Sequence, residues 1–164
     1  MKAKTLALLG LFTGLALIMS YIEALMPIPL PVPGVKVGFP NIIILFILYR
    51  FGTKSAIAVS LVRVLLVSIL FGSALGLVYS FAGAVLSLAV MIILKKTDLF
   101  STLGVSVVGG IAHNAGQIII ASILMSTVEI SYYMPVLIIT GTVAGIVVGI
   151  ASHLLIKNTE KFNF

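Results

Sequence analysis

The chain has 164 residues, of which 61% are apolar and 9% carry a charge. Soluble domains are roughly 45 to 50% apolar and about 25% charged, so this composition excludes a water-soluble globular protein. The absence of cysteine excludes disulfides, thiolate metal sites and a cysteine nucleophile. The net charge of +6 does not indicate nucleic-acid binding, because the basic residues stand singly or in pairs at the ends of apolar runs.

Six apolar stretches predict an all-α integral membrane protein, a bundle of six transmembrane helices that forms one domain over residues 1–164. A hydrocarbon core about 30 Å thick requires roughly 20 residues per helix, which leaves little chain for a soluble domain. The expected stretches are Thr5–Met26, Val37–Tyr49, Ser55–Phe71, Ala74–Leu94, Leu103–Met125 and Tyr133–Ile156.

The first stretch follows Lys2 and Lys4 and has the charge pattern of a signal peptide. It remains apolar to Met26 without a clear small-residue cleavage site, so we interpret it as a retained helix. Gly10 and Gly14, four residues apart, would allow another helix to approach closely. We expect this pair to face another subunit.

The segment Met26–Asn41 contains five of the six prolines, the last of them in the first turn of the second stretch, and it ends with Lys36 and Asn41. Alternating proline favours a stiff extended backbone, so the loop is either a rigid connection or a lid over a ligand. Lys36 and Asn41 suit a ligand with an anionic or polar part, and Tyr21, Glu23 and Tyr79 should lie toward the same outer half. The second stretch reaches about 20 Å, too short to cross alone, so neighbouring helices should shield it.

Arg63 lies near the middle of the third stretch. An arginine at that depth costs at least about 2.5 to 3.5 kcal/mol, so it should face the bundle interior and have a partner. Its planar guanidinium suits carboxylate or phosphate oxygens. The partner could be a substrate or Glu23, the only acidic residue within a stretch, and the sequence leaves both open.

The fifth stretch carries His113, Asn114 and Gln117 within five positions. Side chains one turn apart share a helix face, so these groups would present several donors and acceptors to one cavity. Hydrogen bonds between helices are the alternative, but three such groups exceed what packing requires. We expect them to share a pocket with Arg63. A metal site is disfavoured, because His153 is distant along the sixth stretch and no carboxylate has ligand spacing.

Small residues also recur every four positions elsewhere, and close packing within the chain is the simplest explanation for them. These residues are Gly72, Gly76 and Ser80, and Gly141, Gly145 and Gly149.

The basic residues predict that both termini are cytoplasmic. In that topology eight of the ten basic residues lie inside, Lys36 alone lies outside, and Arg63 is within a span. The eight are Lys2, Lys4, Arg50, Lys54, Lys95, Lys96, Lys157 and Lys161.

A family resemblance rests on four groups of residues: Pro33–Asn41; Arg63; Ser80–Gly83 with Ser87 and Met91; and Ala112–Asn114 with Gln117. In these the chain resembles, over nearly its whole length, the Gx transporter family, also called heptaprenyl diphosphate synthase component I. Its layout is also similar to the substrate-binding S components of energy-coupling factor (ECF) transporters. That resemblance implies an outer-half ligand pocket, a lid in the first loop, and docking of the first helix to a transmembrane coupling protein at Gly10 and Gly14.

The resulting hypothesis is a non-enzymatic S component in the cell membrane, without cofactor or metal, that binds a vitamin-like, isoprenoid- or quinone-related solute. Its partners would be the lipid bilayer, a coupling protein and two cytoplasmic ATPases, because the chain has no phosphate-binding loop of its own. An auxiliary subunit of a prenyl diphosphate or quinone pathway is the alternative, and a secondary transporter is weakened by the lack of an internal repeat. The expected substrate-binding residues are Glu23, Lys36, Asn41, Arg63, Tyr79, His113, Asn114 and Gln117.

Overall fold

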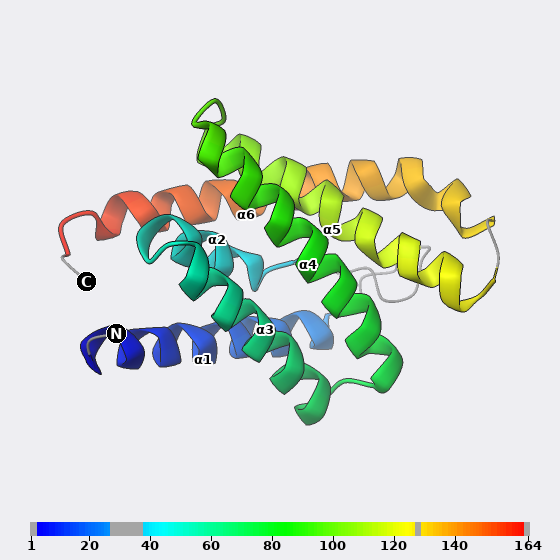
Figure 1. The fold of residues 1–164 in the computed structure, drawn as a ribbon, viewed down its shortest axis with the longest axis horizontal. Helices are drawn as coiled ribbons and strands as arrows, with labels where there is room; N and C mark the ends of the chain where they lie inside the picture. Colours follow the sequence, from blue (N-terminus) through cyan, green and yellow to red (C-terminus); the bar gives the residue numbers. More distant parts are fainter. Residues whose placement is uncertain (1–2, 27–37, 127–128, 163–164) are drawn as a thin grey trace.

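The computed structural model describes residues 3–26, 38–126 and 129–162, and these residues form a bundle of α-helices (Figure 1). The elements are α1 (Ala3–Leu25), α2 (Asn41–Arg50), α3 (Thr53–Leu70), α4 (Ala74–Thr97), α5 (Thr102–Leu124), the 3-10 helix η1 (Glu129–Tyr133) and α6 (Met134–Thr159). The prediction of an all-α, six-helix bundle is confirmed. Lys36 and most of the proline-rich loop lie outside the described residues.

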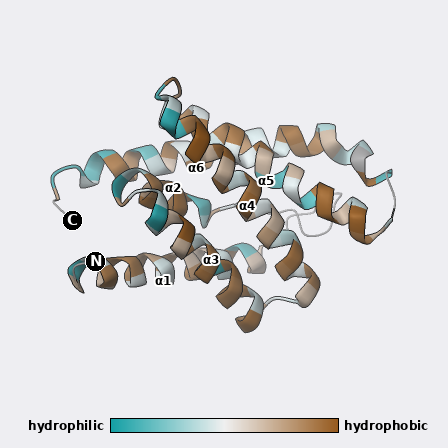
Figure 2. Cartoon of the chain, in the orientation of Figure 1, coloured by the Kyte–Doolittle hydropathy of each residue, from teal (hydrophilic) through white to brown (hydrophobic). Residues whose placement is uncertain are grey.

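Five of these helices, all except α2, are long and apolar enough to cross a membrane. Their large apolar side chains point outward, among them Ile69 and Leu6, which are 77% and 62% exposed. Figure 2 shows hydrophobic residues along the helices and hydrophilic ones mostly toward their ends. An apolar exterior of this kind requires lipid as its solvent, so the chain is a multi-pass membrane protein.

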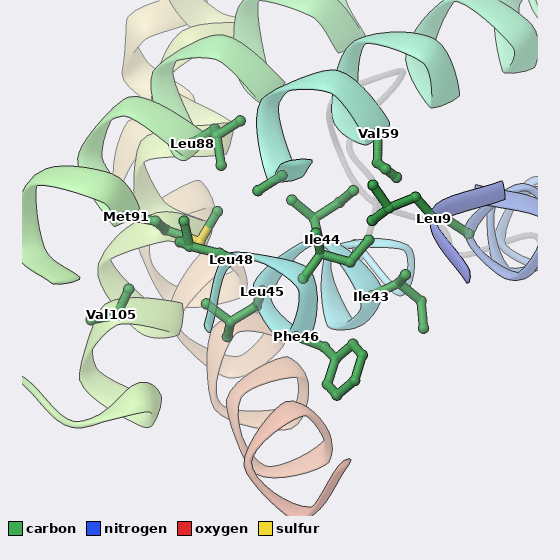
Figure 3. Packing of buried hydrophobic residues seen from close by; sticks show 13 residues of the cluster. Leu9, Ile43, Ile44, Leu45, Phe46, Leu48, Val59, Leu88, Met91 and Val105 are labelled. Atoms are coloured by element: carbon green, nitrogen blue, oxygen red, sulfur yellow. The ribbon is translucent and has the colours of Figure 1, made fainter. Parts of the chain in front are cut away.

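Helix α2 is the core of one half of the bundle. It has ten residues, about 15 Å of helix, and Leu45–Leu48 have no exposed surface. Figure 3 shows its side chains surrounded by Leu9 of α1, Val59 of α3, Met91 of α4 and Val105 of α5. A helix that is apolar on every side is stable only when buried on every side, which explains why so short a segment is shielded from lipid.

The start of α2 differs from the predicted stretch, which began at Val37. The helix begins at Asn41, because Gly38 has a left-handed φ of +86° and Pro40 has no N–H to donate. The apolar run thus continues through a turn that hydropathy alone does not reveal.

Glycines bring α5 into backbone contact with both of its neighbours. A Cβ added at Gly145 of α6 would lie 2.6 Å from Val107 Cα, and one at Gly116 of α5 would lie 2.7 Å from the Ala82 carbonyl oxygen of α4. The stripe of Gly141, Gly145 and Gly149 therefore packs within the chain, as expected.

The stripe that begins at Gly72 is not a helix-packing motif, which corrects that interpretation. The atoms nearest to a Cβ at Gly72 would belong to Ser68 and Val67 in the preceding turn, and a Cβ at Gly76 would meet only the Ser73 hydroxyl among the described residues. Ser73 instead caps α4 by accepting a hydrogen bond from the Gly76 N–H at 3.0 Å. The four-residue spacing here spans the turn between α3 and α4.

Both chain ends lie at the same end of the bundle, together with the α2–α3 connection (Figure 1). Polar contacts join the helices there: Arg50 donates to the Thr159 and Phe162 carbonyls at 2.9 and 2.7 Å, and Lys95 donates to the Leu48 carbonyl at 2.5 Å. Cations at helix C-termini satisfy free carbonyls and oppose the helix dipole. We call this the basic end, and the opposite end, where α1 and α3 finish, the outer end.

Candidate functional site

Many polar side chains lie inside the bundle, whereas in a water-soluble protein most polar side chains lie on the surface. Ten buried polar residues lie on α1, α3, α4, α5 and α6: Ser20, Glu23, Ser60, Arg63, Ser87, Ser106, His113, Asn114, Gln117 and Ser152. Because polar groups facing hydrocarbon cost several kcal/mol, this arrangement concentrates hydrogen-bonding capacity inside the bundle.

Two small cavities lie among these residues, each with a volume of about 20 Å³, room for about one water molecule. We call the first the outer cavity. It is lined by Ser20, Glu23, Gly38, Asn41, Arg63, Val64, Val67, Ser80 and His113. Four of the expected substrate-binding residues, Glu23, Asn41, Arg63 and His113, therefore come together from α1, α2, α3 and α5.

Arg63 is the main charge of the outer cavity. Its side chain is 9% exposed, and its Nε has no hydrogen-bond partner among the described residues. The Glu23 carboxylate is near enough to stabilise the guanidinium charge. The same carboxylate accepts a hydrogen bond from the Gly38 N–H. Glu23 thus serves both Arg63 and the backbone that leads into α2, and Arg63 retains donor capacity toward the cavity.

Asn41 stands at the first position of α2 and is packed against Gly38. A Cβ added at Gly38 would lie 3.0 Å from Asn41 Nδ2. Any side chain at residue 38 would therefore crowd Asn41 and also strain a backbone with positive φ. This turn places the Asn41 side chain at the wall of the cavity.

His113 lies close to the backbone of α4. A Cβ added at Gly83 would lie 2.9 Å from the imidazole Cε1, so the ring occupies the space that the missing side chain leaves. The imidazole lines both cavities. Glycine at 83 thus permits a polar ring at the centre of the bundle.

The second cavity, which we call the inner cavity, lies between α4, α5, α6 and the start of α2. It is lined by Gly38, Asn41, Ser87, Met91, Ser106, Gly109, Gly110, His113, Asn114, Gly141, Ala144, Gly145 and Val148. Its walls consist largely of glycine backbone and small side chains. Ser87 closes one side by donating to the Gly109 carbonyl at 2.8 Å.

The remaining expected residues differ in their surroundings. Asn114 lines the inner cavity and donates to the Leu137 carbonyl of α6 at 2.8 Å, so it also connects two helices. Gln117 is buried but lines neither cavity, and half-buried Tyr79 lines neither. Lys36 falls outside the described residues.

Ser80 and Ser87 of α4 were not among the expected substrate-binding residues, but they line the outer and the inner cavity, respectively. Together with Gly83 and Met91 they are spaced three, four and four residues apart, which places them on one helix face. That periodicity could have identified Ser80 and Ser87 as site residues from the sequence.

Within residues 3–26, 38–126 and 129–162, no group of three metal-ligating side chains comes together. His153 is exposed near the basic end and lines neither cavity. The donors that line the cavities are hydroxyls, amides, an imidazole and a guanidinium, a set suited to an organic ligand.

The sequence profile of heptaprenyl diphosphate synthase component I matches residues 12–155. The chain belongs to this family. A solved structure, described as the S component of a bacterial ECF transporter, has the same fold with a TM-score of 0.69 and 24% identity. The similarity covers 96% of this family member and 96% of that chain. Among curated protein sequences there is no significant match.

Proposed function

We propose that this member of the heptaprenyl diphosphate synthase component I family is the substrate-binding S component of an ECF-type uptake transporter. The observation that carries the proposal is the buried, polar-lined pair of cavities inside a fold shared with an ECF S component over 96% of both chains. A costly internal charge with free donor capacity is characteristic of a substrate site in a membrane protein.

The substrate is a small vitamin-like, isoprenoid- or quinone-related solute with an anionic or polar group. Arg63 meets that group, and Asn41, His113 and Asn114 supply further hydrogen bonds from α2 and α5. We propose a lid role for Lys36 and the proline-rich loop, which lie outside the described residues. Gln117 and Tyr79, which line neither cavity, contact the substrate from positions next to the site.

Docking occurs through the exposed face of α1. A Cβ added at Gly10 or Gly14 would meet nothing within 4 Å, so neither glycine is used for packing within the described residues. Two glycines one turn apart permit a close helix crossing with a coupling protein, whose two ATPases supply the energy.

The alternative is an auxiliary subunit of prenyl diphosphate synthesis without transport activity. The family description favours it. Against catalysis by this chain, no cluster of acidic side chains appears in the part of the chain that the structure describes. Among the described residues that line the cavities, Glu23 is the single carboxylate.

Co-purification distinguishes the two functions. The tagged chain is isolated from its native membrane in mild detergent, and its partners are identified by mass spectrometry. Recovery of a coupling protein with ATPases supports the transporter subunit, whereas recovery of a prenyl synthase without them overturns it. Native mass spectrometry of the same sample identifies any small molecule that the protein retains.

A further inference from the structure

The two cavities are neighbours. They share three lining residues, Gly38, Asn41 and His113. Two of these, the Asn41 amide and the His113 imidazole, are side chains that rotate about single bonds. Movement of the Asn41 amide would join the two spaces, whereas the flanking backbone of α4, α5 and α6 is closely packed.

The cavities differ in charge. The outer cavity contains the Arg63 guanidinium and the Glu23 carboxylate. No lysine, arginine, aspartate or glutamate lines the inner cavity among the described residues. Glycines 109, 110, 141 and 145 bring the helix backbones to its walls, so it accepts a narrow group. Its polar side chains are two serine hydroxyls, two asparagine amides and the His113 imidazole.

The cavities also follow each other along the bundle axis. Glu23 and Val67 of the outer cavity lie within three residues of the ends of α1 and α3, at the outer end. Met91 and Ser106 of the inner cavity lie in the last third of α4 and the first third of α5, toward the basic end. A molecule that filled both would be elongated and would extend past mid-depth.

We propose that the two cavities form one bipartite site for an elongated organic anion. Its carboxylate or phosphate head binds Arg63 in the outer cavity, and its narrow, uncharged body enters the glycine-lined inner cavity past Asn41 and His113. This inference rests on the proposed function for the role of the site, and it adds the shape and polarity of the substrate.

The test compares two probes that share a head and differ in length, dimethylallyl phosphate and geranyl phosphate. Binding to the purified full chain is measured by calorimetry in detergent. The inner cavity as it stands holds about one water molecule, so it must widen to admit the second isoprene unit. Burial of that unit should then make geranyl phosphate bind at least about tenfold more tightly. Arg63→Met should weaken both probes. Equal affinity for the two, or binding of neither, overturns the proposal.

Ala144→Leu tests the inner cavity alone. Ala144 lines that cavity and not the outer one, so a larger side chain should remove the preference for geranyl phosphate while leaving dimethylallyl phosphate binding unchanged. Ala89→Leu is the matched control, because Ala89 is exposed on α4 and the added leucine faces lipid. A preference that persists in Ala144→Leu contradicts the bipartite site.

A smaller substitution guards against misfolding of the leucine variant. The chain has no cysteine, so Ala144→Cys introduces a single thiol. Geranyl phosphate should protect this thiol from a methanethiosulfonate reagent, dimethylallyl phosphate should not, and Ala89→Cys should react equally with or without either probe. Absence of selective protection overturns the proposal.

These outcomes are separable from those of co-purification. If a coupling module is recovered but the probes show no length dependence, the transporter assignment stands and the bipartite site fails. If the probes behave as expected but no coupling module is recovered, the site stands and the transporter assignment fails.

Discussion

Arg63 and Glu23 place opposite charges inside a bundle whose exterior is apolar. Replacing a buried ion pair by apolar residues is often neutral or stabilising, so an ion pair is a weak explanation for retaining both charges. Glu23 divides its carboxylate between Arg63 and the Gly38 N–H. The Arg63 Nε has no hydrogen-bond partner among the described residues, so part of the guanidinium can meet an anionic ligand.

Arg63→Met should therefore weaken binding of the small molecule identified by native mass spectrometry by roughly 2 kcal/mol or more, about thirtyfold in Kd. The reason is loss of a charge-assisted contact in a site shielded from water. Calorimetric titration of the purified variant measures the change.

The control is Arg63→Lys, which retains the charge and should recover only part of the affinity because lysine lacks the planar fork. Full recovery would show that charge alone matters. Unchanged affinity in Arg63→Met would remove Arg63 from the substrate site.

At the scale of elements, the glycines of α5 and α6 decide how closely these helices approach. Lipid gives no hydrophobic drive for helix association, so stability depends on close packing and interhelical hydrogen bonds such as that from Asn114 to Leu137. The same closeness narrows the inner cavity. Packing and ligand selectivity thus depend on the same glycines.

Gly145→Ala should destabilise the protein by about 1 to 3 kcal/mol, because its Cβ would lie 2.6 Å from the Val107 Cα and would force α5 and α6 apart. Thermal unfolding in detergent measures the loss. Gly14→Ala is the matched control: its Cβ meets nothing within 4 Å, and the better helix former should leave stability unchanged or raise it by up to about 1 kcal/mol. Equal stability of the two variants would contradict this packing.

Gly14→Leu should weaken co-purification with the coupling protein while leaving ligand binding intact. The leucine would lie on the exposed side of α1 and block a close helix crossing. The yield of coupling protein per S component is measured after affinity purification. Ala58→Leu, which adds a leucine at an exposed position of α3, should have no effect. Full recovery of the complex with Gly14→Leu would exclude this docking face.

The helices could be predicted from the sequence largely because hydropathy reports burial in lipid directly. Hydropathy failed at Gly38, where a positive φ delays the start of α2. At Gly72 hydropathy placed the turn correctly, but the four-residue spacing of small residues wrongly indicated helix packing. Within the cavities, Arg63 and His113 were conspicuous because polar groups are rare in apolar stretches. The glycines that line the inner cavity could not be recognised as part of a site. Glycines that line a cavity and glycines that pack helices together have the same spacing in the sequence.

At the scale of the whole molecule, the helix ends carry the charge asymmetry that sets orientation. The two termini and the basic contacts of Arg50 and Lys95 share one end of the bundle. Basic residues are retained on the cytoplasmic side of a membrane, so we predict that this end is cytoplasmic. The outer cavity would then face the external medium, as uptake requires.

Cysteine labelling tests that orientation cleanly, because the chain contains no native cysteine. Lys96→Cys places a thiol at the exposed end of α4, and Tyr132→Cys places one in η1, where the side chain is 82% exposed. In intact cells an impermeant maleimide should label Tyr132→Cys only, since the bilayer shields the basic end. After permeabilisation both should react, which shows that both thiols are accessible. Labelling of Lys96→Cys from outside intact cells would reverse the topology and place the Arg63 cavity toward the cytoplasm, a geometry incompatible with capture of an external solute.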